Sequence, residues 1–156
     1  MPRETKPKLR HVGTLSLAVQ YATQDQRVPT RSQLRRWIVA ALERNARITL
    51  RIVDAIEARA LNRIYRKKDY ATNVLTFVYD ELADGCLSGD IVLCASVIAA
   101  EARKQRKELI HHYAHIATHA ALHLQGYDHE ADVDAATMEH REIELLRRMN
   151  ITNPYS

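Results

Sequence analysis

His119-Ala-Ala-Leu-His123-Leu-Gln-Gly126-Tyr-Asp-His129 is the segment around which the rest of the chain is organised. The apolar pattern before it predicts a helix, and residues four apart lie on one helix face, so His119 and His123 can direct ring nitrogens at a single ion. Gly126 can end this helix because glycine adopts the left-handed conformation without steric cost, and His129 can then return as a third ligand. Three nitrogen ligands with an open fourth position are typical of catalytic zinc. The sequence therefore predicts one zinc ion per chain, bound by His119, His123 and His129.

The other polar residues near this segment are weaker candidates. His111 and His112 lie near the start of the predicted helix, where we expect them to be solvated. His115 precedes the first ligand by one turn, so it is a candidate either to orient that ligand or to lie on the helix surface. Asp128 is adjacent to the third ligand, where an acidic side chain can orient a histidine or cap the turn. The sequence leaves these alternatives open.

Length and composition predict one soluble globular domain. The chain has 156 residues, of which 46% are hydrophobic and 27% are charged, which suits a single core. We expect a flexible basic tail over 1–11, a single catalytic domain over 12–150 and a C-terminal tail over 151–156. No apolar run approaches the roughly 20 residues of a membrane-spanning helix, and the first residues carry no signal-peptide pattern. We therefore expect a cytoplasmic monomer without a membrane partner, with Cys86 and Cys94 as reduced thiols.

The charge distribution suggests an anionic partner. The formal net charge is +4, and basic residues gather in several runs, among them Arg63 to Lys68. A basic surface is typical of proteins that bind nucleic acid. Solvated helix faces produce similar runs, so charge alone leaves both interpretations open.

Hydrophobic periodicity predicts a small mixed sheet with helices around it. Apolar and polar residues alternate over 14–21 and over 47–52, which predicts half-buried strands, and the helical pattern between them favours a parallel pair with a crossover helix. Further along we expect a buried strand over 73–79, a loop over 80–89 and a short strand over 91–94, joined as a hairpin. The remaining helices are expected over about 54–65, 96–107, 108–125 and 134–149. This order predicts an α/β (α+β) fold with a small mixed four-stranded sheet. The spacing of the histidines, and not the order of the elements, predicts a zinc site of the metalloprotease (zincin) type on one of its helices.

The histidine spacing is also that of the metzincin proteases, but their general base is missing. In those enzymes a glutamate beside the first ligand accepts a proton from the zinc-bound water. Ala120 occupies that position and cannot accept a proton, which disfavours peptide hydrolysis by that route. Zinc can also promote attack on a phosphodiester. The Arg63 to Lys68 run is a candidate for binding its phosphate, because the planar fork of arginine matches two phosphate oxygens.

Three segments occur in an order that is typical of one known family. They are Leu61-Asn62-Arg63-Ile64-Tyr65-Arg66-Lys67-Lys68-Asp69 with Thr72 to Phe77, then Gly89-Asp90-Ile91-Val92-Leu93-Cys94 with Glu101-Ala102, and then Ala114-His115-Ile116 through His119 to Gly126-Tyr127-Asp128-His129. Together they resemble the YbeY-type endoribonucleases, which are bacterial rRNA maturation factors. The chain departs from the family pattern at a few positions, none of them a predicted ligand: Ala71, Thr76, Val78 and Ala120.

The resemblance implies a fold distantly like that of zinc proteases, with zinc on His119, His123 and His129. It also implies that Arg66, at the position of the family's arginine, contacts RNA phosphate, so the candidate catalytic residues are Arg66, His119, His123 and His129. The implied activity is cleavage of single-stranded RNA in 3′-end maturation of 16S rRNA and in ribosome quality control, with the small ribosomal subunit and its rRNA as partners.

Two other functions are compatible with the same residues. One is a metalloprotease-like hydrolase, which Ala120 disfavours. The other is a non-catalytic RNA-binding or ribosome-assembly factor that keeps its metal for stability.

Overall fold

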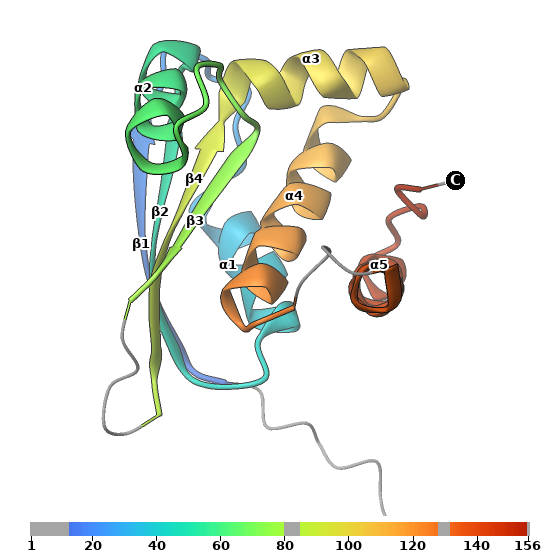
Figure 1. Ribbon diagram of the computed structural model, residues 1–156. Helices are drawn as coiled ribbons and strands as arrows, with labels where there is room; N and C mark the ends of the chain where they lie inside the picture. The colour runs from blue at the N-terminus through green and yellow to red at the C-terminus, as the bar shows by residue number, and fades with distance from the viewer. Residues whose placement is uncertain (1–12, 80–84, 128–131, 156) are drawn as a thin grey trace, which may run out of the picture.

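A mixed four-stranded sheet lies at the centre of the computed structural model, which describes residues 13–79, 85–127 and 132–155 (Figure 1). The spatial order of its strands is β1-β2-β4-β3. The strands are β1 (Leu15–Ala22), β2 (Ala46–Val53), β3 (Val74–Val78) and β4 (Leu87–Cys94). β1, β2 and β4 run parallel, whereas β3 pairs antiparallel with β4 at the edge. The predicted parallel pair, the hairpin and the α/β fold with a mixed four-stranded sheet are confirmed.

Five helices of the described chain pack around this sheet: α1 (Arg31–Ala41), α2 (Ala55–Arg66), α3 (Ala95–Gln105), α4 (Leu109–Leu124) and α5 (Asp132–Arg148). α1 and α4 cover one face and share the larger hydrophobic core with it, whereas α2 covers part of the other face over a smaller core. α5 packs on α4 away from the sheet (Figure 1). α4 therefore lies between the sheet and α5, which leaves few of its residues accessible.

Local sequence explains where α1 begins, whereas the residue at the cap of α2 has a different partner. The Thr30 hydroxyl oxygen caps α1 by accepting a hydrogen bond from the backbone N–H of Gln33 at 3.1 Å, and the backbone N–H of Thr30 donates to Oε1 of Gln33 at 2.9 Å, as the predicted capping box requires. Asp54 lies at the cap of α2 but its carboxylate does not bond to the helix. It accepts instead from the hydroxyl of Thr23. Cys86 and Cys94 are buried and form no disulfide with each other, in agreement with the predicted thiols.

β4 is longer than the sequence predicts, because Gly89 belongs to the strand and not to a loop. β4 begins at Leu87 and pairs with β2 along its whole length. A Cβ atom on Gly89 would lie 2.7 Å from the carbonyl oxygen of Phe77 and 3.0 Å from a methyl group of Leu124. Glycine is therefore needed here for close packing between the β3–β4 hairpin and α4.

Replacing Gly89 with alanine is expected to destabilise the protein by about 1–3 kcal/mol, because the added methyl group meets backbone that cannot move easily. Urea denaturation followed by circular dichroism would measure this change. Ser88→Ala, one residue earlier on the same strand, is the matched control and should change the free energy of unfolding by less than about 0.5 kcal/mol. Equal midpoints for Gly89→Ala and wild type would contradict the packing argument.

The structure describes the C-terminal end of the chain up to residue 155 but not the first twelve residues. The predicted tail over 1–11 lies outside the described residues. At the other end, the side chain of Ile151 is buried in the larger core. Among the described residues, no helix is both long and apolar enough to cross a membrane.

Candidate functional site

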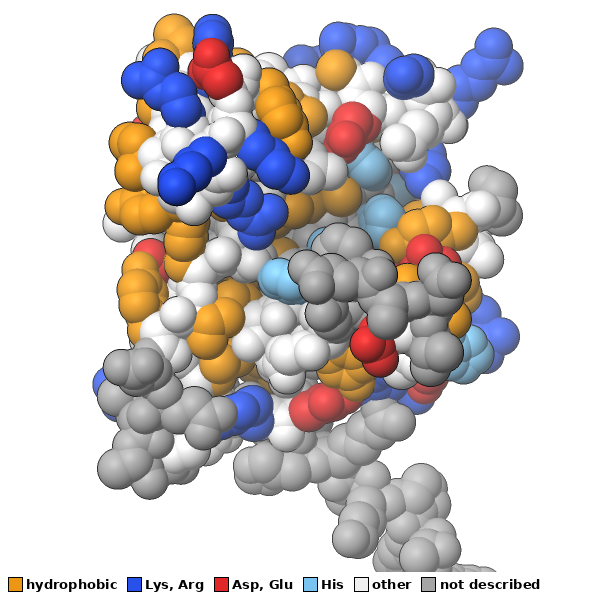
Figure 2. All heavy atoms as spheres, viewed as in Figure 1, with side chains coloured by type: hydrophobic (Ala, Val, Ile, Leu, Met, Phe, Trp, Pro, Cys, Tyr) orange, Lys and Arg blue, Asp and Glu red, His pale blue; other side chains and the backbone are white. Residues whose placement is uncertain are grey.

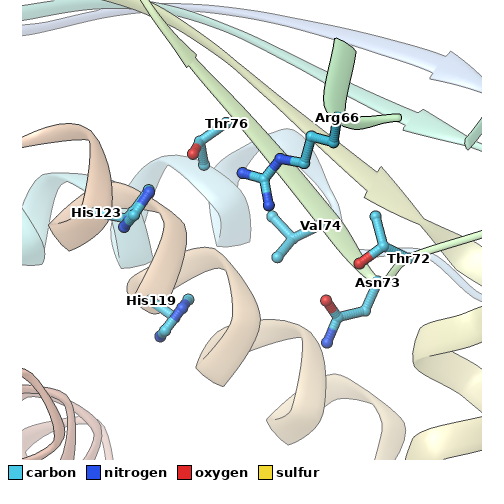
Figure 3. Close-up of a pocket in the computed structure, with 7 residues that line it drawn as sticks. All are labelled: Arg66, Thr72, Asn73, Val74, Thr76, His119 and His123. Carbon is cyan, nitrogen blue, oxygen red and sulfur yellow. The ribbon is translucent and has the colours of Figure 1, made fainter. Parts of the chain in front are cut away.

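A polar pocket lies between α4, the edge strand β3 and the end of α2 (Figure 3). Its lining consists of Arg66, Thr72, Asn73, Val74, Thr76, His119 and His123. Arg66 is the last residue of α2, and the two histidines belong to α4. The structure thus brings together three of the four predicted site residues from distant parts of the sequence. The fourth, His129, lies outside the described residues.

The two histidines are presented as a pair on one side of α4. They lie one helical turn apart, and their rings are parallel to within 4° with centroids 6.5 Å apart. The residues between them are fully buried in the core, Ala120 among them. The position that carries a general base in metzincins therefore faces the core and not the pocket.

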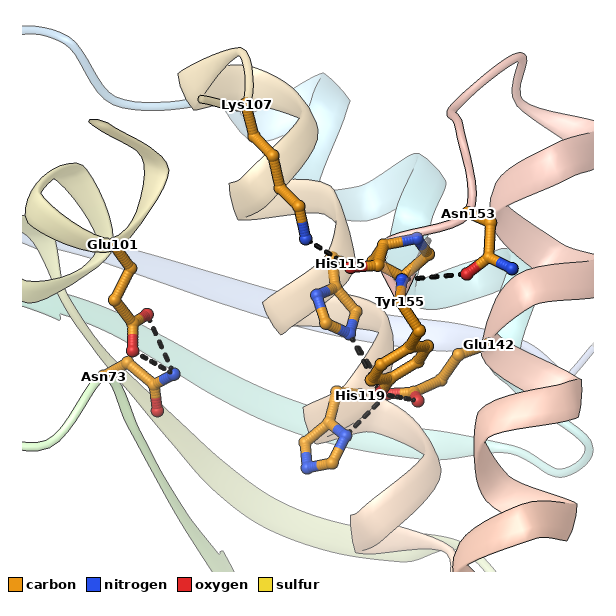
Figure 4. A network of polar contacts seen from close by, with 9 residues as sticks. Asn73, Glu101, Lys107, His115, His119, Glu142, Asn153 and Tyr155 are labelled. Atoms are coloured by element: carbon orange, nitrogen blue, oxygen red, sulfur yellow. Dashed lines mark hydrogen bonds and ion pairs between the residues drawn. The ribbon is translucent and has the colours of Figure 1, made fainter. Parts of the chain in front are cut away.

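Glu142 of α5 supports His119 from behind (Figure 4). Its carboxylate is fully buried, and Oε1 lies 2.6 Å from Nδ1 of His119. Burial alone would raise the pKa of Glu142, but hydrogen bonds with His115, His119 and Tyr155 outweigh it and lower this pKa to about 2. A carboxylate can only accept hydrogen bonds, so Nδ1 of His119 is the nitrogen that donates, and in the neutral ring the lone pair then lies on Nε2. That tautomer is the one that a histidine needs in order to bind a metal through Nε2.

The described part of the site fits a zinc ion but does not make a complete set of ligands. Imidazole nitrogens suit zinc, and a metal-binding histidine usually donates its other ring N–H to a carboxylate, as His119 does to Glu142. Among the described residues, no group of three His, Cys, Asp or Glu side chains is arranged to hold a metal. The zinc site on His119, His123 and His129 remains a prediction.

The wall opposite the histidines is held by a second polar cluster. Asn73 donates from its amide nitrogen to Oε1 of Glu101 at 3.1 Å (Figure 4). Nε2 of His112 lies 2.9 Å from the same oxygen. His112 is only 3% exposed, and this burial lowers its pKa, although the Glu101 carboxylate offsets part of the effect. The expectation that His112 is solvated is therefore wrong, because α3 packs against this end of α4. The cluster turns the Asn73 amide nitrogen toward Glu101 and its oxygen away from it.

Arg66 extends from the end of α2 into the pocket, and its guanidinium group lies across from the two histidines (Figure 3). Arg63, Lys67 and Lys68 are exposed beside it. Figure 2 shows lysine and arginine side chains gathered over α2, on the same face of the molecule as the histidines. This face therefore presents a positive surface at the entrance to the pocket.

The position of Glu142 in the sequence indicates that it is buried and paired. The spacing of the histidines does not indicate this residue. Glu142 follows Met138 by four residues and precedes Leu145 by three, so it falls on the apolar face of the last helix, and all three side chains are buried. A charged residue on such a face is rarely buried without a partner. The clue indicates a buried partner but does not say which residue it is.

The lowered pKa of Glu142 predicts a specific acid sensitivity of the metal-free protein. Its folded-state pKa of about 2 lies below the usual 4.5, so its stabilising effect is present above pH 4.5 and is lost as the pH falls toward 2. Between about pH 5 and pH 3, the free energy of unfolding should fall more steeply for wild type than for Glu142→Gln. Urea denaturation at a series of pH values would measure the two slopes. The exposed Glu139→Gln should behave as wild type, and parallel curves for wild type and Glu142→Gln would contradict the assignment.

Comparison with known proteins places the sequence among proteins of one name. A family model described as endoribonuclease YbeY matches residues 18–150. The chain is 57% identical to endoribonuclease YbeY of Thiobacillus denitrificans over 141 residues, which are 90% of this chain and 96% of that protein. It is 53% identical to the protein of the same name from Herminiimonas arsenicoxydans, over 90% of this chain and 95% of that protein.

A solved structure supports the fold independently. The solution structure of a Thermotoga maritima protein superposes with a TM-score of 0.53, covering 86% of this chain and 91% of that one, at 19% sequence identity. At that identity the likeness concerns the fold alone. The family model and the relatives cover most of the sequence, including the residues of the pocket, and the chain therefore belongs to the endoribonuclease YbeY family.

Proposed function

We propose that the protein is a zinc-dependent endoribonuclease that cleaves single-stranded RNA. The observation that carries the proposal is a pocket lined by two histidines on one side and by Arg66 on the other. One of these histidines, His119, is hydrogen-bonded to a buried carboxylate. The names of its relatives support an enzyme that hydrolyses RNA. The single-stranded substrate, the 3′ end of 16S rRNA and ribosome quality control on the small subunit are proposed from the family resemblance. A cytoplasmic location and a monomeric state are proposed from the sequence pattern alone.

In this proposal His119, His123 and His129 hold the zinc ion, which when bound supplies Lewis-acid activation of water and of the phosphoryl group. Glu142 keeps His119 in the tautomer that binds metal, through the 2.6 Å contact with Nδ1. Arg66 grips phosphate oxygens from the other side of the pocket and stabilises the charge that develops on them. Asn73 and Thr76 also line the pocket, where the polar side-chain atoms of these two residues can hydrogen-bond to the sugar or phosphate of the RNA.

The competing functions make different demands on the same pocket. A protease of the metzincin type needs a base beside the first histidine, and here that position is the fully buried Ala120. A non-catalytic RNA-binding factor would need the basic surface, but it would not need Arg66 and the two histidines to line the same pocket.

One set of incubations separates these functions. Zinc-loaded protein is mixed with labelled single-stranded RNA, with an RNA duplex and with casein, each with and without a chelator. We expect cleavage of the single strand only, loss of that cleavage on chelation and recovery on adding zinc back. Hydrolysis of casein would favour a protease, and tight RNA binding without cleavage would favour a non-catalytic factor.

A further inference from the structure

The segment 151–155 leaves the end of α5 and returns along α4 to the back of the candidate site (Figure 4). Ile151 anchors it in the core, and Lys107 donates to the carbonyl oxygen of Pro154. The backbone N–H of Tyr155 donates to Oδ1 of Asn153 at 2.8 Å. These contacts place the Tyr155 side chain against Glu142. The segment lies outside the residues that the family model matches.

Tyr155 engages the oxygen of Glu142 that His119 does not use. Its hydroxyl donates to Oε2 at 2.6 Å, whereas His119 holds Oε1. Its ring also meets the ring of His115 edge-on, with centroids 5.3 Å apart at 82°, and its hydroxyl lies 3.3 Å from Nε2 of His115. Tyr155 as a residue is 45% exposed, while Glu142, whose carboxylate it contacts, is fully buried. The structure therefore shows a chain of contacts from Tyr155 through Glu142 to His119.

A hydrogen bond on each oxygen fixes a carboxylate more firmly than a bond on one. With Oε2 held, the carboxylate cannot rotate about its last bond without breaking a contact. The direction of Oε1 toward Nδ1 of His119 is then defined. Removing one donor from a buried charged acceptor leaves it under-satisfied and weakens the whole network.

We propose that Tyr155 is a positioning residue of the candidate metal site, because its hydroxyl holds the Glu142 carboxylate in the orientation that presents His119 to the metal. This rests on the proposed function insofar as His119 binds zinc. Tyr155 acts through Glu142 and touches neither the metal nor the RNA.

The variant Tyr155→Phe tests this, because it keeps the ring and its contact with His115 and removes only the hydroxyl. Zinc affinity, measured by competition with a chromogenic chelator, should fall by about tenfold, the lower end of the range for partners of metal-binding histidines. Tyr70→Phe, which changes an exposed tyrosine away from Glu142, is the matched control and should bind zinc as wild type does. Thermal unfolding should show that both variants are folded.

A double-mutant cycle distinguishes positioning from a general structural effect. Glu142→Gln should weaken zinc binding by about 10–100-fold. Because Tyr155 acts through Glu142, adding Tyr155→Phe to Glu142→Gln should produce little further loss. In metal-free protein, nitrogen NMR of the His119 ring should show one tautomer in wild type and a shift toward a mixture of tautomers in Tyr155→Phe.

The outcomes separate this inference from the proposed function. If wild type binds zinc but does not cleave RNA, the proposed function fails, and the zinc affinities still decide the role of Tyr155. If wild type binds no zinc, the NMR comparison of the His119 ring in wild type and Tyr155→Phe decides whether Tyr155 orients His119 through Glu142. Unchanged zinc affinity in Tyr155→Phe, an effect that adds fully to that of Glu142→Gln, or identical His119 signals in wild type and Tyr155→Phe would each overturn the inference.

Discussion

Replacing His123 with alanine is expected to abolish tight zinc binding and to lower RNA cleavage by roughly 10³–10⁴-fold. One of the proposed ligands is lost, and a catalytic metal contributes several kcal/mol to the stabilisation of a transition state. His119→Ala should have the same effect on zinc and activity, with an additional loss of stability of about 1–3 kcal/mol, because the buried Glu142 carboxylate loses its hydrogen bond with His119 at Oε1 and keeps the one from Tyr155 at Oε2. Comparing the two variants therefore separates the ligand role from the support of Glu142.

Zinc content by mass spectrometry and initial rates on labelled RNA would measure these effects. His140→Ala is the matched control, since His140 is exposed on α5, and it should keep both zinc and activity. Zinc retained at one ion per chain after replacing both His119 and His123 would show that the metal binds elsewhere.

Replacing Arg66 with alanine is expected to lower RNA cleavage by roughly 10²–10³-fold while leaving zinc content and fold intact. This is the scale observed when one group that stabilises transition-state charge is removed. Arg66 lines the pocket opposite the histidines, so it can reach phosphate oxygens on the side away from the metal. Arg66→Lys should recover only part of the activity, since lysine keeps the charge but lacks the planar fork.

Lys67→Ala provides the matched control, because Lys67 is the next residue in the same basic run but does not line the pocket. It should lower activity far less than Arg66→Ala. Rates would be compared at equal zinc content and at several salt concentrations, since a general contribution of surface charge weakens as salt is added. Equal rates for wild type and Arg66→Ala would show that Arg66 is a solvated surface charge without a role in RNA cleavage.

The order of the helices and strands was predictable because it depends on local periodicity. The alternation around Leu17 and Leu50 and the helical spacing from Leu34 to Ala41 both correspond to buried faces in the structure. The start of β4 was not predictable in this way, because it depends on contacts between distant residues. Gly89 is typical of loops, but here it permits close contact with Phe77 and Leu124, and both partners are distant in sequence.

The candidate site was predictable only where its residues share one helix or one family motif. His119 and His123 follow from their spacing on α4, and Arg66 from the family resemblance. Glu142 and Tyr155 reach the site through contacts between α4, α5 and the segment after it, and no spacing in the sequence encodes those contacts. His112 was misassigned for the same reason, since its burial depends on Glu101 of α3.

Anomalous diffraction from crystals of the zinc-loaded protein tests the central claim most directly, because it locates the metal without reference to activity. We predict one zinc ion per chain in the pocket, within about 2.0–2.1 Å of a ring nitrogen of each of His119, His123 and His129. On His119 that nitrogen should be Nε2, with Nδ1 still bonded to Glu142. Zinc found away from this pocket, or rings of His119, His123 and His129 directed apart with no metal between them, would contradict the account.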